Sequence, residues 1–150
     1  MSVTTVGAAI ASVQSDITGL KNAYAHDELP GDLHTAMLPA FLNFPDAAEY
    51  TILSHGYVQE IREWRMQLFV QPLGRDHDPA RAGAALEAFF RRVFEEFLDS
   101  IQLESLADVK CAMVLRDTGW VVLNWARKEY IGTEFRLQVT EKFTVTNYGS

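Results

Sequence analysis

The chain has 150 residues, 48% of them hydrophobic, so it can bury one core and is not intrinsically disordered. Its formal net charge of −7 argues against a protein that grips nucleic acid, because phosphate binding needs a surplus of lysine and arginine. A single cysteine, Cys111, excludes an internal disulfide and a cysteine-based zinc site. No apolar run reaches the roughly 18–20 residues of a membrane-spanning helix, so no membrane partner is expected.

The first quarter of the chain predicts one helix and a long loop. Apolar residues recur at steps of three and four, which predicts an amphipathic helix over about residues 3–18 that ends at Gly19. The pattern stops over residues 24–37, a longer irregular segment than a minimal connection needs. This segment carries three acidic residues and two histidines: Asp27, Glu28, Asp32, His26 and His34.

Strand patterns follow this loop. The apolar run MLPAFLNF (residues 37–44) and the short run EYTILSH (residues 49–55) predict two strands, with Pro45 between them. The clearest strand signal is EIREWRMQLFVQPL, residues 60–73. Its alternation puts one set of side chains toward the core and another toward solvent or a partner. The first set is Trp64, Met66, Leu68 and Val70, and the second is Glu63, Arg65 and Gln67.

A second amphipathic helix is predicted within residues 74–100. Asp78 is a suitable N-cap and Pro79 suits the first helical position. Six large apolar residues form its buried stripe: Leu86, Phe89, Phe90, Val93, Phe97 and Leu98. On the outer face, Arg91 and Glu95 are four residues apart, as are Arg92 and Glu96, which is the spacing of helical ion pairs.

Three further strands are predicted: residues 108–116, 120–130 and 133–146. Short gaps join consecutive strands, so the sheet is expected to be mainly antiparallel. The order therefore predicts a single α+β domain over residues 1–150. It has about five or six strands, with two amphipathic helices packed on one face.

The triplet Asp117-Thr118-Gly119 has two interpretations. Aspartic proteases hold their catalytic carboxylate in such a triplet, and a chain this short would have to act as a homodimer using Asp117. However, Arg116 precedes the triplet and Trp120 follows it, where those enzymes carry an apolar and a small residue. The favoured interpretation is a three-residue hairpin loop, in which the aspartate caps the turn and the glycine takes a left-handed conformation.

The histidine-containing loops raise the alternative of a metal site, but solvated loop residues are favoured. No two histidines have the spacing of a helical zinc motif, so no metal ligand and no cofactor is expected. Trp120 is more informative. It shares one strand face with Val122 and Asn124, while Trp125 lies on the other face, so the sheet here is either covered on both faces or pressed against another subunit. The favoured interpretation is a core helix on one face and a neighbouring subunit on the other.

The arrangement of several segments resembles the tail terminator, or tail-completion, proteins of long-tailed bacteriophages. These segments are ITGLKNAYAHDELP, LPAFLNFP, the long strand REWRMQLFVQPLG, the N-capped helix and the final strand VTEKFTV. The resemblance covers most of the chain and implies a small α+β subunit of a homohexameric ring. Such a ring caps the tail tube protein, stops its polymerisation and receives the head–tail connector protein. DNA passes through it without specific binding. The family has no catalytic residues to carry over.

The resemblance therefore implies a structural protein of the virion tail, assembled in the host cytoplasm, and not an enzyme. The alternatives are a neck or head-completion protein of the same particle, the homodimeric protease, and a small binding domain with an unknown ligand. Partner or oligomer contacts are expected in the acidic loop of residues 25–34, in the loop of residues 73–77 and on the open strand face. The expected contact residues are Asp27, Glu28, Asp32, Arg75, Asp76, His77, Arg65, Gln67 and Trp120.

Overall fold

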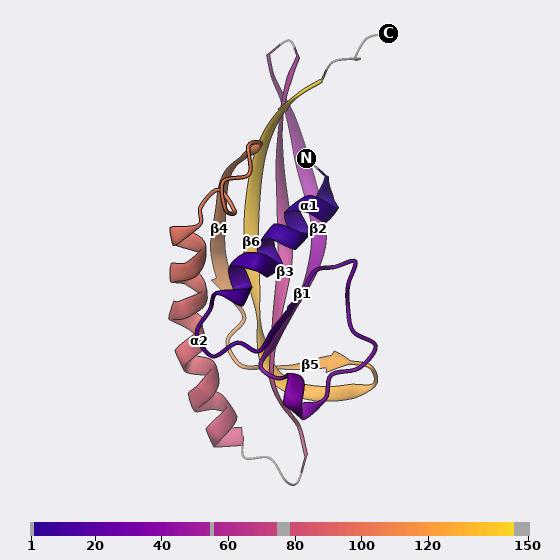
Figure 1. Ribbon diagram of the computed structural model, residues 1–150, viewed down its shortest axis with the longest axis vertical. Helices are drawn as coiled ribbons and strands as arrows, with labels where there is room; N and C mark the ends of the chain where they lie inside the picture. The colour runs from indigo at the N-terminus through magenta and orange to yellow at the C-terminus, as the bar shows by residue number, and fades with distance from the viewer. Residues whose placement is uncertain (1, 55, 75–78, 146–150) are drawn as a thin grey trace.

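Two long antiparallel strands form the centre of the computed structural model, which describes residues 2–54, 56–74 and 79–145 (Figure 1). The elements, in chain order, are α1 (Val3–Ser15), β1 (Asn22–Tyr24), the 3-10 helix η1 (Thr35–Met37), β2 (Ala40–Ser54), β3 (Tyr57–Pro72), α2 (Pro79–Asp99), β4 (Val109–Asp117), β5 (Val121–Trp125) and β6 (Lys128–Thr144). β3 pairs with β6, and the sheet has the order β1-β2-β3-β6-β4, with β5 pairing the start of β6. Only the β1–β2 pair is parallel. The predicted α+β class is confirmed.

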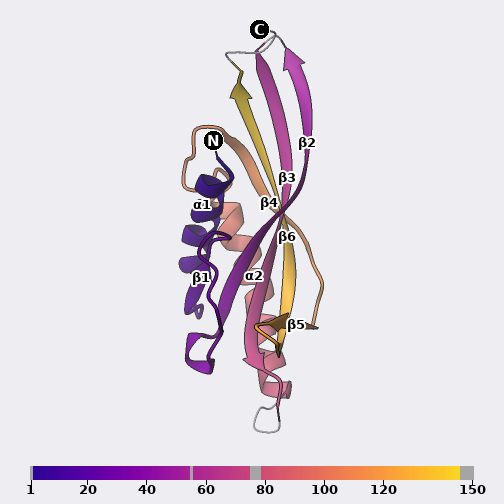
Figure 2. The same ribbon diagram turned by 90° about the vertical axis from the view of Figure 1, so that its right-hand side faces the viewer.

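Both helices pack on one face of the sheet, as expected from their apolar stripes (Figure 2). α1 begins where the Ser2 hydroxyl accepts a hydrogen bond from the Thr5 N–H. It ends at Ser15 with Asp16 as its C-cap, three residues earlier than predicted, and Gly19 (φ +93°) lies in the turn that follows. The inward-facing residues predicted for β3 are all buried. The main core consists of α1 and α2 residues on the strands, including Ile10, Val13, Val93, Phe97, Trp64, Met66, Phe135 and Leu137.

A second, smaller core lies on the opposite face, at the end of the sheet where β5 lies. Along β2, Phe41 belongs to the main core while Ala40 and Leu42 belong to the second one, because successive strand residues point to opposite faces. The irregular segment after β1 covers this face with buried Leu33 and Leu38. The two faces of the sheet are therefore both covered at this end, by helices on one side and by a loop and a hairpin on the other.

The opposite end of the sheet is covered by neither core. There the β2–β3 hairpin extends beyond the helices together with the end of β6, and forms a projecting arm (Figures 1 and 2). We define the arm as residues 47–54 and 56–59. Its two most exposed apolar side chains are Ile52, at 79%, and Tyr50, at 60%. The arm thus presents β-structure with both faces accessible.

Several predicted strand boundaries were wrong. The two runs before residue 56 form one strand, β2, because a bulge between Pro45 and Ala48 lets the chain pass the proline and continue the same ladder. The run of residues 120–130 is interrupted by a two-residue turn. Ala126 and Arg127 both have positive φ there (51° and 65°), although neither is a glycine or asparagine. β6 therefore begins at Lys128.

At Gly132 the two central strands approach each other closely. A Cβ atom at this position would lie 2.0 Å from the backbone oxygen of Leu68, which cannot move without breaking the β3–β6 ladder. We therefore expect Gly132→Ala to destabilise the fold by roughly 2–3 kcal/mol in chemical denaturation. Gly31→Ala is the control, because its Cβ would meet nothing within 4 Å. Equal stability of the two variants would contradict this account.

Candidate functional site

A charged network occupies the open face of the sheet, opposite the helices. Asp46 lies at the β2 bulge, where its carboxylate accepts a 2.5 Å hydrogen bond from Arg136 and lies 3.9 Å from Arg65. The hydrogen bond from Arg136 and one from the Ala47 N–H hold the pKa of Asp46 below its usual value, and the same contact raises the pKa of Arg136. Glu134 completes the network, 3.4 Å from Arg136. This face is therefore ordered by its own ion pairs.

Two of the expected contact residues take part in this internal network. Gln67 donates a 3.0 Å hydrogen bond to Glu134, and the Arg65 guanidinium lies 5.1 Å from the centre of the Phe44 ring. Both side chains point to the open face, as the alternation along β3 predicts, and both are half-buried. Any partner on this face would meet a network that is already satisfied.

The acidic loop is anchored to the β5–β6 hairpin. Trp125 donates a hydrogen bond to the carbonyl of Pro30, and the buried Tyr130 hydroxyl donates one to the carbonyl of Leu33. Asp32 accepts a 3.0 Å hydrogen bond from Lys128, which, with a further one from the Leu33 N–H, lowers the pKa of Asp32. Asp32, one of the three acidic residues predicted to bind a partner, is thus held by Lys128, which lies 96 residues away in sequence.

Asp27 and Glu28, on the same loop, are exposed. Among the residues that the structure describes, no group of three or more histidine, cysteine or acidic side chains could hold a metal ion. His26 packs edge-on against Trp64, with ring centres 5.4 Å apart, and lies over Gly7 of α1. The structure therefore places His26 in a packing role between the loop and the core. Arg75, Asp76 and His77, and the predicted N-cap Asp78, lie outside the described residues.

The segment Asp117–Trp120 is a break between two strands rather than the tip of a hairpin. β4 and β5 do not pair with each other, because both pair with β6, one after the other along its length. The local interpretation was correct: the Asp117 carboxylate accepts a hydrogen bond from the Gly119 N–H, and Gly119 has φ +69°. The hairpin prediction was wrong because a local turn signal does not show which strand each flank pairs with.

Trp120 lies against α2. The helix has a buried glycine, Gly83, and a Cβ there would fall 1.4 Å from a ring atom of Trp120. The indole therefore packs on the bare backbone of the helix, while 49% of the residue remains exposed. This predicted partner contact has an internal role, and its exposed part forms a shallow apolar surface with Leu73 and Val122.

Sequence reasoning missed a pair of carboxyl groups at the base of the arm. Glu60 of β3 and Glu141 of β6 are directly paired across the ladder, and both are buried. Arg62 contacts Glu60 at 2.8 Å. Burial raises the pKa of Glu141 to about 7, with a further rise from the charge of Glu60. The alternation itself was the available signal, because Glu141 continues the inward series Phe135, Leu137 and Val139.

No known family model matches this sequence, and no curated protein shows significant similarity to it. Neither helix of the described chain is long and apolar enough to cross a membrane.

The contact between Trp120 and Gly83 yields a double-mutant test. Alanine at position 83 favours a helix by up to about 1 kcal/mol over glycine, but its methyl group must displace the indole. Overpacking costs roughly 1–3 kcal/mol, so we expect Gly83→Ala to destabilise the protein. In a Trp120→Ala background the same change should stabilise it. Chemical denaturation of the four proteins measures both effects, and identical effects in the two backgrounds would contradict the contact.

The buried carboxyl pair predicts a specific pH dependence. The folded-state pKa of Glu141, about 7, lies above the 4.5 usual for a glutamate, so its contribution to stability is complete below pH 4.5 and is lost as pH rises through 7. We expect Glu141→Gln to match the wild type near pH 5 and to be more stable by roughly 1–3 kcal/mol near pH 8. Glu49→Gln, an exposed change on the arm, is the control. A difference that does not vary with pH would refute the role of this carboxyl group.

Proposed function

We propose that this chain is a structural assembly protein, a tail terminator whose subunits form a ring on the end of a phage tail tube. The observation that carries the proposal is the projecting arm, together with exposed apolar side chains at the opposite edge of the sheet. The arm exposes Tyr50, Ile52 and Leu53, and the opposite edge exposes Phe94 and Leu98 of α2 and Met113 and Leu115 of β4. A lone subunit leaves both in water, whereas a chain of like subunits can bury one against the other.

The positions of these two surfaces favour a ring over a two-fold dimer. They lie on different elements, the arm on the β2 side of the sheet and the other surface on α2 and β4 at the opposite edge. A contact between two different patches is heterologous, and it closes into a ring when the rotation between neighbours divides a full turn. This is the assembly that the resemblance to tail terminators implies.

The charge of the chain is consistent with this proposal. Six copies carry a formal charge of −42 (6 × −7). An acidic channel repels phosphates, so genome DNA can cross it without being held. In this proposal the ring works by shape and surface: one side meets the tail tube protein and the other receives the head–tail connector, with no cofactor.

Two measurements test the proposal. Native mass spectrometry and negative-stain microscopy of the purified 16.9 kDa chain should show rings, with six copies at about 101 kDa (6 × 16.9). Coexpression with the tail tube protein encoded by the same phage should then give tubes that carry a ring at one end and stop growing. A protein that stays monomeric at every concentration would refute the proposal. Rings that bind filled heads and never tube ends would instead indicate a neck protein.

A further inference from the structure

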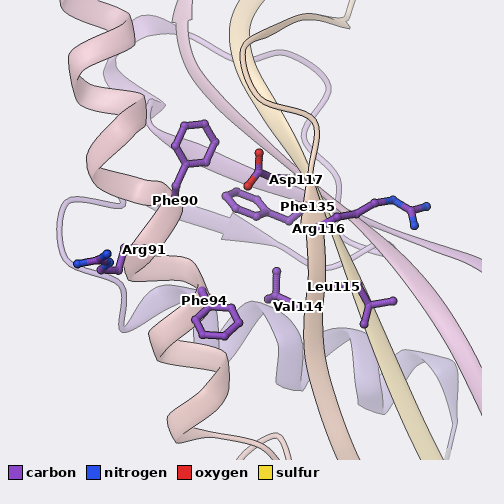
Figure 3. Close-up of a pocket in the computed structure, with 8 residues that line it drawn as sticks. All are labelled: Phe90, Arg91, Phe94, Val114, Leu115, Arg116, Asp117 and Phe135. Carbon is purple, nitrogen blue, oxygen red and sulfur yellow. The ribbon is translucent and has the colours of Figure 1, made fainter.

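The inward side of β6 changes from apolar to ionisable at the base of the arm. Figure 3 shows Phe135 of β6 beside Phe90 of α2, and the centres of these two rings are 6.1 Å apart. Leu137 and Val139 continue the series within the main core. Because strand residues alternate between faces, the next inward residue is Glu141, which is only 6% exposed. A carboxyl group therefore ends a buried apolar row.

The residue opposite Glu141 in the ladder is a second buried carboxyl group. Glu60 of β3 pairs directly with Glu141, so the backbone holds their Cβ atoms about 4.5–5.5 Å apart. The Glu60 carboxylate accepts hydrogen bonds of 2.8 and 3.0 Å from the Arg62 guanidinium and a longer one of 3.4 Å from the Tyr50 hydroxyl. By contrast, Oε1 of Glu141 is buried and has no hydrogen-bond partner in the described part of the chain. Arg62 thus compensates one carboxylate of the pair and not the other.

Two ionised carboxylates in this arrangement repel each other, and neither can donate a hydrogen bond. An ionised carboxylate only accepts hydrogen bonds, so a hydrogen bond between two carboxyl groups needs a proton on one of them. Burial and a neighbouring like charge both favour the protonated form. Because Arg62 stabilises Glu60 as the anion, the proton belongs on Glu141, which can donate it in a hydrogen bond to Glu60. That bond joins β3 to β6 in addition to the backbone ladder.

No positive side chain neutralises Glu141 within the described ranges. β4 places the apolar Val109 opposite it, and α1 carries no ionisable side chain. Lys142 lies on the other face, where its amino group is 5.0 Å from the centre of a tyrosine ring. Burial raises the pKa of Glu141 to about 7, with further rises from the charges of Glu60 and Asp108, while the positive amino terminus of the chain acts in the opposite direction. The surroundings therefore favour the protonated form.

The carboxyl pair lies at the last level where the sheet supports the arm from the side. Val109, the first residue of β4, pairs with Glu141, so β4 does not extend beyond this level. Further out, the hairpin and β6 meet in three register pairs, and the Val145 N–H then donates a 2.9 Å hydrogen bond to the carbonyl of Gly56. A short ladder with few buried apolar contacts opens locally at a low free-energy cost. Its closure therefore depends on how firmly its base is held.

We propose that the proton shared by Glu141 and Glu60 locks the base of the arm, and that its loss releases the end of β6 from the hairpin. With the proton in place, Glu141 donates a hydrogen bond to Glu60 across the ladder. When the proton leaves to solvent water, two carboxylates face each other in a buried position. Separation of residues 141–145 from the hairpin hydrates both of them. The inference concerns the subunit itself and does not depend on the ring proposed above.

Hydrogen exchange of the full chain, followed by NMR, tests the lock. The carboxyl group of Glu141 has its raised pKa of about 7 in the closed arm and the usual 4.5 once the arm opens, so closure is favoured in acid and weakens as pH rises through 7. Protection factors, which correct for the intrinsic pH dependence of exchange, should fall at least about tenfold at residues 142–145 between pH 5.5 and pH 8. The amide of Leu137, at the centre of β6, should change much less. An equal fall at Leu137, or no fall at residues 142–145, would overturn the proposal.

Two variants assign the effect to the pair. Glu141→Gln should remove the pH dependence at residues 142–145, because an amide donates a hydrogen bond to Glu60 without needing a proton. Glu60→Gln should remove it as well, since its amide can donate to the Glu141 carboxylate. Glu49→Gln, an exposed change on the arm, is the matched control and should keep the full pH dependence. A pH dependence that persists in both Glu141→Gln and Glu60→Gln would refute the lock.

Trypsin gives a second readout at a single pH. Lys142 is exposed but lies in a strand, so cleavage after it requires the end of β6 to leave the hairpin. At pH 8 the wild type should be cut there several-fold faster than Glu141→Gln, with each rate normalised to that of the same chain in denaturant. Glu49→Gln should be cut at the wild-type rate. Equal normalised rates for the wild type and Glu141→Gln would contradict the proposal.

Discussion

The antiparallel pairing of β3 with β6 is the constraint on which the rest of the structure depends. The two strands stay in register from Tyr57–Thr144 to Pro72–Tyr130, with one irregularity, so they span the whole length of the molecule. Every other strand except β1 pairs directly with one of them. Because the ladder is longer than either helix can cover, one end is packed on both faces and the other end projects as the arm.

This unequal coverage explains where the functional candidates lie. At the packed end, polar groups that seemed free in the sequence are used internally: Asp32 binds Lys128, and Trp120 rests on Gly83. At the projecting end, Ile52 and Leu53 remain exposed, while the Tyr50 hydroxyl donates a hydrogen bond to Glu60 and accepts one from Arg62. The base of the arm joins these two regions, and there the ladder brings Glu60 and Glu141 together in a buried position. Because these two carboxyl groups are buried side by side, we expect the stability at the base of the arm to depend on pH.

Several features of the fold could be predicted because they depend on local spacing. The apolar stripes of α1 and α2 and the alternation along β3 each follow from a period of a few residues. The stripe of α1 and the alternation along β3 were confirmed, and so was the stripe of α2 except for Leu98, which is 51% exposed. Pairing partners could not be predicted in the same way. The turn at Asp117 has the residues of a hairpin, but β6 offers a longer continuous edge to both flanks, and strand pairing follows that edge. The two strands predicted on either side of Pro45 likewise form one strand, because both segments pair with β3 across the bulge.

The sequence by itself determined the α+β class, the two helices, the inward and outward faces of the strands and the local conformation at Gly119. Only the tertiary structure decided which side chains are free to meet a partner. It tied the acidic loop to a hairpin about 95 residues away and left Ile52 and Phe94 in solvent. The physical reason is that exposure depends on long-range register, and a one-position change in register moves every side chain to the other face. The periodicity of the sequence determines which segments form helices and strands, and the pairing of the strands determines which side chains are exposed.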